Sequence, residues 1–222
     1  MLASTPWTWA GRLPMVEAIA ANLAAAEDCR IHGHAQIVMF EPEAPVFTLG
    51  RRALTPAGRA ELAPTIALCA QRDIPVIAAD RGGLGTLHLP GQLVCFVARP
   101  CRRSRLPALV DRLLRAALEV ALELGLNAEL RSGEHMGIWL PQGKLASIGL
   151  RLDRGVICHG MSVNVAVDRD LAHGLSLCGH VHTRLANLVC AGDRTHEGAP
   201  SGVESVQTVA RRLAAGLDLA AR

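Results

Sequence analysis

The stretch LSLCGHVHTRLANL, residues 175–188, contains one cysteine and two histidines at alternating positions. Cys178, His180 and His182 could provide zinc ligands, because thiolate and imidazole groups bind zinc in proteins. A structural zinc site needs a fourth ligand, and no C-x-x-C or H-x-x-x-H motif supports one here, so we expect no metal. Cys178 could instead be a buried, inert thiol, or a nucleophile if a nearby cation lowers its pKa. The stretch alone does not decide between these two interpretations.

A cation that could activate a thiol is available at Lys144, the only lysine among 23 Lys and Arg residues. A lone lysine among arginines suggests that the position requires a compact amine that can lose its proton. An arginine-preferring sequence could also retain one lysine by chance. The segment that Lys144 opens, KLASIGLRLDRGVICHGMSVN (144–164), also contains His159 and Asn164. Spacing does not tell whether Lys144 lies close to Cys178.

A third unusual segment is rich in glycine: DRGGLGTLHLPGQL, residues 80–93. Glycine allows positive φ and lets a backbone approach a ligand closely. The pattern is neither the phosphate-binding nor the dinucleotide-binding glycine motif. Arg81 and His88 are the polar groups that the segment could present to a ligand. A surface loop with turn glycines is the competing interpretation.

Elements that could position these residues follow from the periodicity of the chain. Helices are expected over 15–29, 57–73, 107–125 and 202–221, although Pro64 could mark the true start of the second. Strands are expected over 36–42, 46–50, 75–80, 93–100, 137–141, 144–154 and 156–168. Tight turns at PQG and RG would join the last three strands. This order indicates an α/β (α+β) fold with a mixed sheet, and no linker divides it, so we expect one catalytic domain over 1–222.

The composition excludes several classes of protein. Half of the 222 residues are hydrophobic, which allows a sizeable core, and the net charge of +3 is too small to indicate nucleic-acid binding. Arginines cluster at 51–52 and 99–105, which would suit an acidic partner. Seven irregularly spaced cysteines favour a reducing compartment over a disulfide framework. Without a signal-peptide pattern or a membrane-length apolar run, we expect a soluble cytoplasmic protein.

Four segments match, in order, the motifs of one enzyme family. PVFTLGRRA (45–53) is similar to P-V-[FY]-T-L-G-R, and RGGLGTLHLPGQL (81–93) is similar to R-G-G-Q-x-T-Y-H-G-P-G-Q-L. KLASIGLRLDRGVICHGMSVNVAVD (144–168) is similar to K-I-A-S-I-G-[LV]-R…RG…H-G-[FL]-A-L-N-x-x-x-D, and CG (178–179) follows at the expected distance. These motifs span most of the chain, and they resemble those of the lipoyl(octanoyl) transferases, the octanoyl-acyl carrier protein:protein octanoyltransferases.

The resemblance implies the fold shared by biotin and lipoate protein ligases, with a mixed, largely antiparallel sheet flanked by helices. It implies transfer of an octanoyl, or medium-chain acyl, group from acyl carrier protein to a specific lysine of lipoyl domains, the first step of endogenous protein lipoylation. The acceptors would be lipoyl domains of 2-oxoacid dehydrogenases and the glycine cleavage H protein. Neither a cofactor, nor nucleic acid, nor a membrane is implied.

The resemblance also implies roles for individual residues. Cys178 would hold the acyl group as a thioester, and Lys144 would lower the pKa of this thiol and shuttle protons. His159 and Asn164 would support the site. Substrate contacts would come from three segments: Arg81, Gly82, Gly83, Leu84, Gly85, Thr86, Leu87 and His88; then Ser147, Ile148 and Gly149; then Gly160, Met161 and Ser162.

The chain departs from the family pattern around His88. Leu84, Leu87 and Leu89 replace the Gln, Tyr and Gly of the motif, which leaves the preferred acyl chain length open. Two alternatives therefore accompany the transferase. One is an ATP-dependent lipoate or biotin-type protein ligase, which needs no cysteine nucleophile, although the biotin ligase motif G-R-G-R-x-G is absent. The other is a non-catalytic paralogue that binds acyl carrier protein or lipoyl domains.

Overall fold

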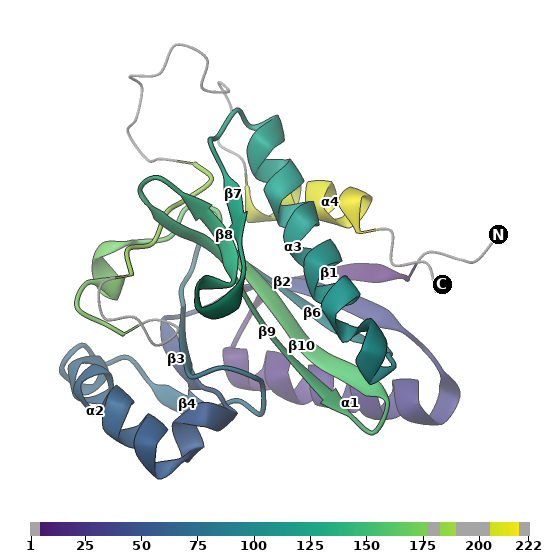
Figure 1. Ribbon diagram of the computed structural model, residues 1–222, viewed down its shortest axis with the longest axis horizontal. Coiled ribbons are helices and arrows are strands. Elements are labelled where there is room, and N and C mark those ends of the chain that lie inside the picture. The colour runs from purple at the N-terminus through teal and green to yellow at the C-terminus, as the bar shows by residue number, and fades with distance from the viewer. Residues whose placement is uncertain (1–4, 177–182, 190–204, 218–222) are drawn as a thin grey trace.

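The structure is a computed structural model that describes residues 5–176, 183–189 and 205–217. A seven-stranded sheet forms its centre, in the order β1-β2-β6-β10-β9-β8-β7 (Figure 1). Only β1 and β2 are parallel in it, and every other neighbouring pair is antiparallel. Its strands are β1 (Trp7–Leu13), β2 (Gln36–Pro42), β6 (Gln92–Pro100), β7 (Glu129–Arg131), β8 (Gly137–Leu140), β9 (Gly143–Asp153) and β10 (Val156–Asn164).

A second, three-stranded sheet has the order β4-β3-β5, with β3 parallel to β4 and antiparallel to β5. Its strands are β3 (Val46–Leu49), β4 (Val76–Ala78) and β5 (Gly85–His88). The helices are α1 (Met15–His32), α2 (Pro56–Gln71), α3 (Leu106–Glu123) and α4 (Val206–Gly216), with short 3-10 turns at Arg51–Leu54, Arg103–Arg105, Gly133–His135 and Asp170–Ala172. The predicted fold, a mixed and largely antiparallel sheet flanked by helices, is confirmed.

Strand β6 explains why helices cover both faces of the large sheet. Leu93, Cys95 and Val97 pack into the main core, to which α3 and α4 contribute. Val94 and Phe96 point to the opposite face and pack with the start of α1. Successive side chains of a strand alternate between faces, so a strand buried on both faces is a continuous apolar run.

Helix α2 covers the small sheet, and it begins at Pro56, before the alternative start that the sequence suggested at Pro64. The Thr55 hydroxyl accepts a hydrogen bond from the Gly58 amide, and Pro56 occupies the first turn, so the helix has a regular N-terminal cap. Pro64 lies inside the helix. The suggestion that Pro64 marks the start of this helix is therefore wrong.

Other boundaries differ from the sequence-based expectation for local reasons. Helix α1 extends past residue 29 to His32, where Gly33 adopts a left-handed conformation and ends it. Strand β10 ends at Asn164 and not at residue 168, because the amides of Val165 and Ala166 turn to the carbonyl of Gly91. Strands β1, β5 and β7 were not predicted. Of the helix predicted over 202–221, α4 begins at Val206 after the Ser205 cap and ends at Gly216, and residues 202–204 and 218–221 lie outside the described residues.

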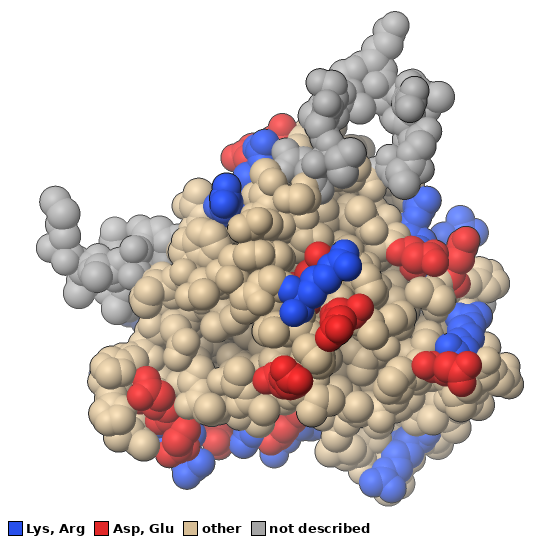
Figure 2. Space-filling model, turned by 180° about the vertical axis from the view of Figure 1, so that it is seen from behind, with Lys and Arg blue, Asp and Glu red and all other residues tan. Residues whose placement is uncertain are grey.

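Three general features of the described residues are the distribution of charge, the hydropathy of the helices and the state of the cysteines. Figure 2 shows acidic and basic side chains interspersed over one face of the molecule. None of the helices in the described part of the chain is long and apolar enough to cross a membrane. The described cysteines are free thiols, at positions Cys29, Cys69, Cys95, Cys101 and Cys158.

Candidate active site

A small cavity, partly open to solvent, lies where α1, the large sheet and the small sheet meet. Its walls combine an apolar part with a polar part. The apolar part consists of Met15, Ile19, Ala79, Val94, Phe96, Ile148 and Met161, and the polar part includes Thr48, Arg81, Thr86, His88, Ser147, His159 and Ser162. Such a mixture suits a ligand with an aliphatic portion and a polar head.

Two of the three predicted substrate-binding segments line this cavity completely, namely Ser147–Gly149 on β9 and Gly160–Ser162 on β10. Gly149 and Gly160 are directly paired across these strands. A Cβ atom at Gly160 would lie 1.8 Å from the Cys95 carbonyl oxygen, so only glycine fits there. The paired glycines leave this part of the cavity wall without side chains.

The third predicted segment contributes only Arg81, Thr86 and His88 to the cavity. Residues 85–88 form β5, in which Thr86 and His88 share one face by strand alternation. Gly82, Gly83, Leu84, Gly85 and Leu87 are absent from the cavity wall.

The three leucines that depart from the family pattern are buried in the core of the small sheet. Leu84, Leu87 and Leu89 are at most 3% exposed and pack with Phe47 and Leu62. None of the three lines the cavity, and Leu87 borders the small recess that contains Lys144. The substitutions therefore change core packing beside the cavity more than they change its lining.

Lys144 is 3% exposed and lies in a recess beside the cavity. This Lys144 recess is also lined by Thr86, Leu87, Gln92, Ser147, Asn164 and Leu185. Thr86 and Ser147 border both spaces, so the recess and the cavity adjoin.

A β-bulge explains how Lys144 and Ser147 come to face the same space. Consecutive residues Ile138 and Trp139 of β8 pair with Ala146 and Lys144 of β9, so Leu145 is an extra residue on β9. Residues three apart in a regular strand point to opposite faces. The extra residue at Leu145 reverses the alternation and turns Lys144 to the side of Ser147.

The side chain of Lys144 is held by its neighbours. Its Nζ atom lies 5.4 Å from the centre of the Trp139 ring, a cation–π distance. A Cβ atom at Gly137 would lie 2.4 Å from the Ala146 carbonyl oxygen and 2.7 Å from Lys144 Cε, so glycine at this position leaves room both for the neighbouring strand and for the lysine chain. The φ of +146° at Gly137 also disfavours any other residue.

The backbone of Lys144 pairs with the segment that follows Cys178 in the sequence. The Lys144 amide donates to the Arg184 carbonyl at 2.8 Å, and the Ala186 amide donates to the Lys144 carbonyl at 2.9 Å. Cys178 itself, like Gly179, His180 and His182, lies outside the described residues.

A chain of buried hydrogen bonds links Lys144 to His88. Asn164 Nδ2 donates to the Lys144 carbonyl at 3.2 Å, and Gln92 Nε2 donates to Asn164 Oδ1 at 2.8 Å. Gln92 Oε1 then faces His88 Nδ1 at 2.8 Å. The Lys144 carbonyl can only accept, so Asn164 must present Nδ2 to it and Oδ1 to Gln92. Gln92 must then present Nε2 to Asn164 and Oε1 to His88, and His88 donates from Nδ1. His88 Nε2 therefore carries a lone pair.

Burial is the main reason why His88 is neutral. Desolvation, followed by the positive charge of Arg81, lowers the pKa of His88 to about 3. Arg81 is itself fixed, since its guanidinium donates to the carbonyl and hydroxyl oxygens of Thr48 and to the Gly82 carbonyl. His88 can thus accept a hydrogen bond in the cavity at neutral pH, but it is a weak base.

His159, a second cavity histidine, adopts a strained conformation. Its φ is +62°, which is uncommon for a residue other than glycine, and its amide donates to Asn22 Oδ1 at 2.6 Å. Burial and then Arg81 lower its pKa to about 4. Its buried Nε2 atom has no hydrogen-bond partner among the described residues, which leaves it available to a ligand or to water.

Sequence reasoning missed several residues of these two spaces. Gln92 was part of a quoted motif, and its amide could have been recognised as a partner for His88. Met15, Ile19 and Asn22 carry no such signal, because apolar and small polar residues of a helix have the same pattern whether they face a core or a cavity.

Comparisons with known proteins agree with the motifs. The Xanthomonas campestris pv. campestris (strain B100) "Octanoyltransferase" is 35% identical over 170 residues, which are 75% of this chain and 65% of that protein, so the match spans less than two thirds of this relative. The enzyme of the same name from Xanthomonas euvesicatoria is 34% identical over 82% of this chain and 72% of its own length. The expected enzyme class, an acyltransferase, agrees with these relatives.

A structural comparison supports the expected fold. The structure described as "lipoate-protein ligase A bound with ATP" has a TM-score of 0.73 and covers 96% of this chain and 84% of its own. At 14% identity this likeness concerns the fold alone. The sequence model of the lipoyl protein ligase A/B catalytic domain matches residues 15–213. The chain therefore belongs to the family of the lipoyl protein ligase A/B catalytic domain.

Proposed function

We propose that this chain is an octanoyltransferase that moves an octanoyl group from acyl carrier protein to a lysine of lipoyl domains, through a thioester on Cys178. The names of its relatives support octanoyl transfer. The donor, the acceptors and the cysteine intermediate are the finer parts of the proposal.

The observation that carries the proposal is the position of Lys144. The only lysine of the chain is buried, adjoins a partly apolar cavity, and pairs through its backbone with Arg184 and Ala186. Arg184 is six residues after Cys178 in the sequence. This arrangement supports a cysteine–lysine pair at the mouth of an acyl-binding cavity.

The first step would be attack of the Cys178 thiolate on the donor thioester. A new Sγ–C bond forms and the bond to the donor sulfur breaks. That sulfur would take a proton from the Lys144 ammonium, so the donor leaves as a thiol and Lys144 becomes neutral. One thioester replaces another, so the energy of the acyl bond is kept and no ATP is needed. The ammonium of Lys144 would stabilise the thiolate by its opposite charge.

The second step would be attack of the neutral amine of the acceptor lysine on the Cys178 thioester. An amide bond forms, the Cys178 sulfur leaves as a thiolate, and the amine gives up one proton. Lys144 in its neutral form could accept that proton and so act as the general base. The enzyme ends the cycle with Cys178 again as a thiolate.

The experiment is incubation of the purified chain with octanoyl-acyl carrier protein, followed by intact-mass measurement. The wild type should gain one octanoyl group, and Cys178→Ala should gain none. Cys101→Ala is the matched control, because Cys101 is the most accessible of the described thiols and should not affect loading. If the wild type never acquires this mass, the thioester mechanism is wrong.

The exposed arginines near the start of α3 are a proposed contact for the acyl carrier protein. Arg102 and Arg103 are exposed, and no ion pair with a described carboxylate is found for either. Reversing both charges should weaken donor binding and reduce its salt dependence, since such steering acts over about 10 Å. Arg211→Glu on α4 is the control. Equal affinity of the wild type and the double variant across a salt series would contradict this contact.

A further inference from the structure

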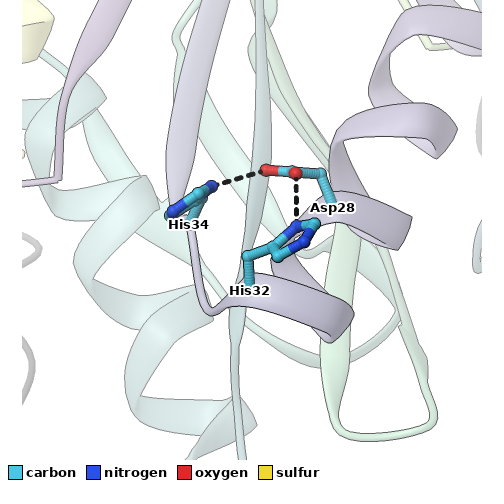
Figure 3. A group of neighbouring side chains, drawn as sticks. All are labelled: Asp28, His32 and His34. Carbon is cyan, nitrogen blue, oxygen red and sulfur yellow. Dashed lines mark hydrogen bonds and ion pairs between the residues drawn. The ribbon is translucent and has the colours of Figure 1, made fainter.

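Three side chains with metal-binding groups converge at the C-terminal end of α1, away from the candidate active site. Asp28 and His32 belong to the last turns of the helix, and His34 follows Gly33 (Figure 3). His32 Nδ1 lies 2.9 Å from one oxygen of the Asp28 carboxylate, and His34 Nδ1 lies 3.1 Å from the other. Both imidazoles thus point at one carboxylate.

The backbone brings the three residues together. Asp28 and His32 are four residues apart on a helix, so they share one face. Gly33, with a φ of 77°, ends the helix and donates its amide to the Cys29 carbonyl, which folds the chain back toward that face. The two imidazole rings then stack, with 5.4 Å between their centres and 23° between their planes.

The distances suit an ion with short bonds. One ligand atom from each residue lies within 4.8 Å of the other two. Bonds of about 2.0–2.2 Å from zinc to nitrogen and oxygen place tetrahedral ligands about 3.3 Å apart. The observed nitrogen–oxygen distances of 2.9 and 3.1 Å are close to this value. These two distances run to different oxygens of Asp28, so rotation of the exposed side chains, which brings atoms now within 4.8 Å of one another closer together, would admit an ion among the three groups.

The chemical types of the three ligands indicate which metal ions could bind. Two imidazoles and one carboxylate favour zinc, nickel or copper over magnesium and calcium, which prefer oxygen ligands. The side chains are 42–71% exposed, so water can supply the remaining coordination position.

The cluster is remote from the proposed reaction. The cavity touches α1 at Met15 and Ile19, and His32 lies about 20 Å farther along the helix axis. An ion here would instead join the end of α1 to the turn that leads into β2. Its expected effect is on the stability of the fold and not on acyl transfer.

We propose that Asp28, His32 and His34 form a surface site for one divalent zinc-class ion. The test is titration of tag-free, reduced protein with Zn²⁺ in competition with a chromophoric chelator, together with Tm measurements. The wild type should bind one more zinc ion than His32→Asn or His34→Asn, and zinc should raise its Tm. Each variant should bind at this site about tenfold more weakly or worse.

His173→Asn is the matched control, because His173 is an exposed histidine on a different segment. It should keep the stoichiometry and the Tm increase of the wild type. The comparison between variants also removes any contribution from zinc bound at other cysteines and histidines. The proposal is overturned if His32→Asn and His34→Asn bind as much zinc as the wild type with equal affinity, or if zinc leaves the Tm of the wild type unchanged.

Discussion

Replacing Asn164 by leucine should break the hydrogen-bond chain between Lys144 and His88. Asn164 is 5% exposed, and it joins Gln92 Nε2 to the Lys144 carbonyl. Leucine fills a similar volume but neither donates nor accepts. The Lys144 carbonyl keeps its bond from the Ala186 amide, so the main loss is the shorter of the two hydrogen bonds of the buried Gln92 Nε2, which keeps only the 3.5 Å contact with the Leu87 carbonyl.

The size of the effect follows from that single buried donor. Leaving one buried polar group without a partner costs about 1–3 kcal/mol. For a chain of 222 residues, each kcal/mol lowers Tm by about 2–4 °C. The free energy of unfolding of Asn164→Leu should therefore fall by about 1–3 kcal/mol, which corresponds to about 2–12 °C in Tm.

A double-mutant cycle measures whether the two amides act together. Asn164→Leu, Gln92→Leu and the double variant are unfolded in urea. The double variant should lose less than the sum of the single losses, by at least about 0.5 kcal/mol, because it contains neither half of the broken Gln92–Asn164 bond. Asn187→Leu is the matched control. Asn187 is also buried, and it accepts from the Val167 amide and donates to the Val167 carbonyl.

The same variants test the tautomer of His88. Nitrogen NMR of the wild type should show a protonated Nδ1 and an unprotonated Nε2. Asn164→Leu leaves the Gln92 amide oriented only by the 3.5 Å contact of its Nε2 with the Leu87 carbonyl. Both tautomers of His88 should then become populated, whereas Asn187→Leu should leave the spectrum of His88 unchanged. Strictly additive losses in the cycle, or an Nε2-protonated His88 in the wild type, would refute the directed hydrogen-bond chain.

Three further perturbations test the site. The pKa values of His88 and His159, about 3 and about 4, lie below the unfolded value of about 6.5, so the unfolded chain binds more protons. The free energy of unfolding should fall on acidification below about pH 6.5, by up to about 2.7 kcal/mol per pH unit; equal urea midpoints throughout this range would contradict it. Gly137→Ala adds a methyl group that meets the Ala146 carbonyl and Lys144 Cε, so it should shift β9 and the Lys144 amine and slow single-turnover acylation about 100-fold, and an unchanged rate would exclude this role. Ile19→Trp should reduce loading of octanoyl donors more than of butyryl donors; equal losses, judged by intact mass, would place Ile19 outside the acyl path.

Local patterns were enough for most of the secondary structure. The apolar segment 93–100 identified the strand β6, which the structure shows to be buried on both faces. The turn at Arg154 and Gly155, both with positive φ, joins β9 and β10 as expected. The pattern failed at Pro64, where a capped helix start at Thr55 outweighs one interior proline. It also missed β5, because glycines concealed the alternation of Thr86 and His88.

The motifs in the sequence also determined the family and the set of residue types available for chemistry. The tertiary structure decided which of those residues meet. The bulge at Leu145 turns Lys144 toward Ser147, and a carbonyl 56 positions away along the chain sets the tautomer of His88. The tautomer depends on contacts between segments far apart in sequence, and the bulge depends on the pairing register of the neighbouring strands β8 and β9. No local pattern contains either of them.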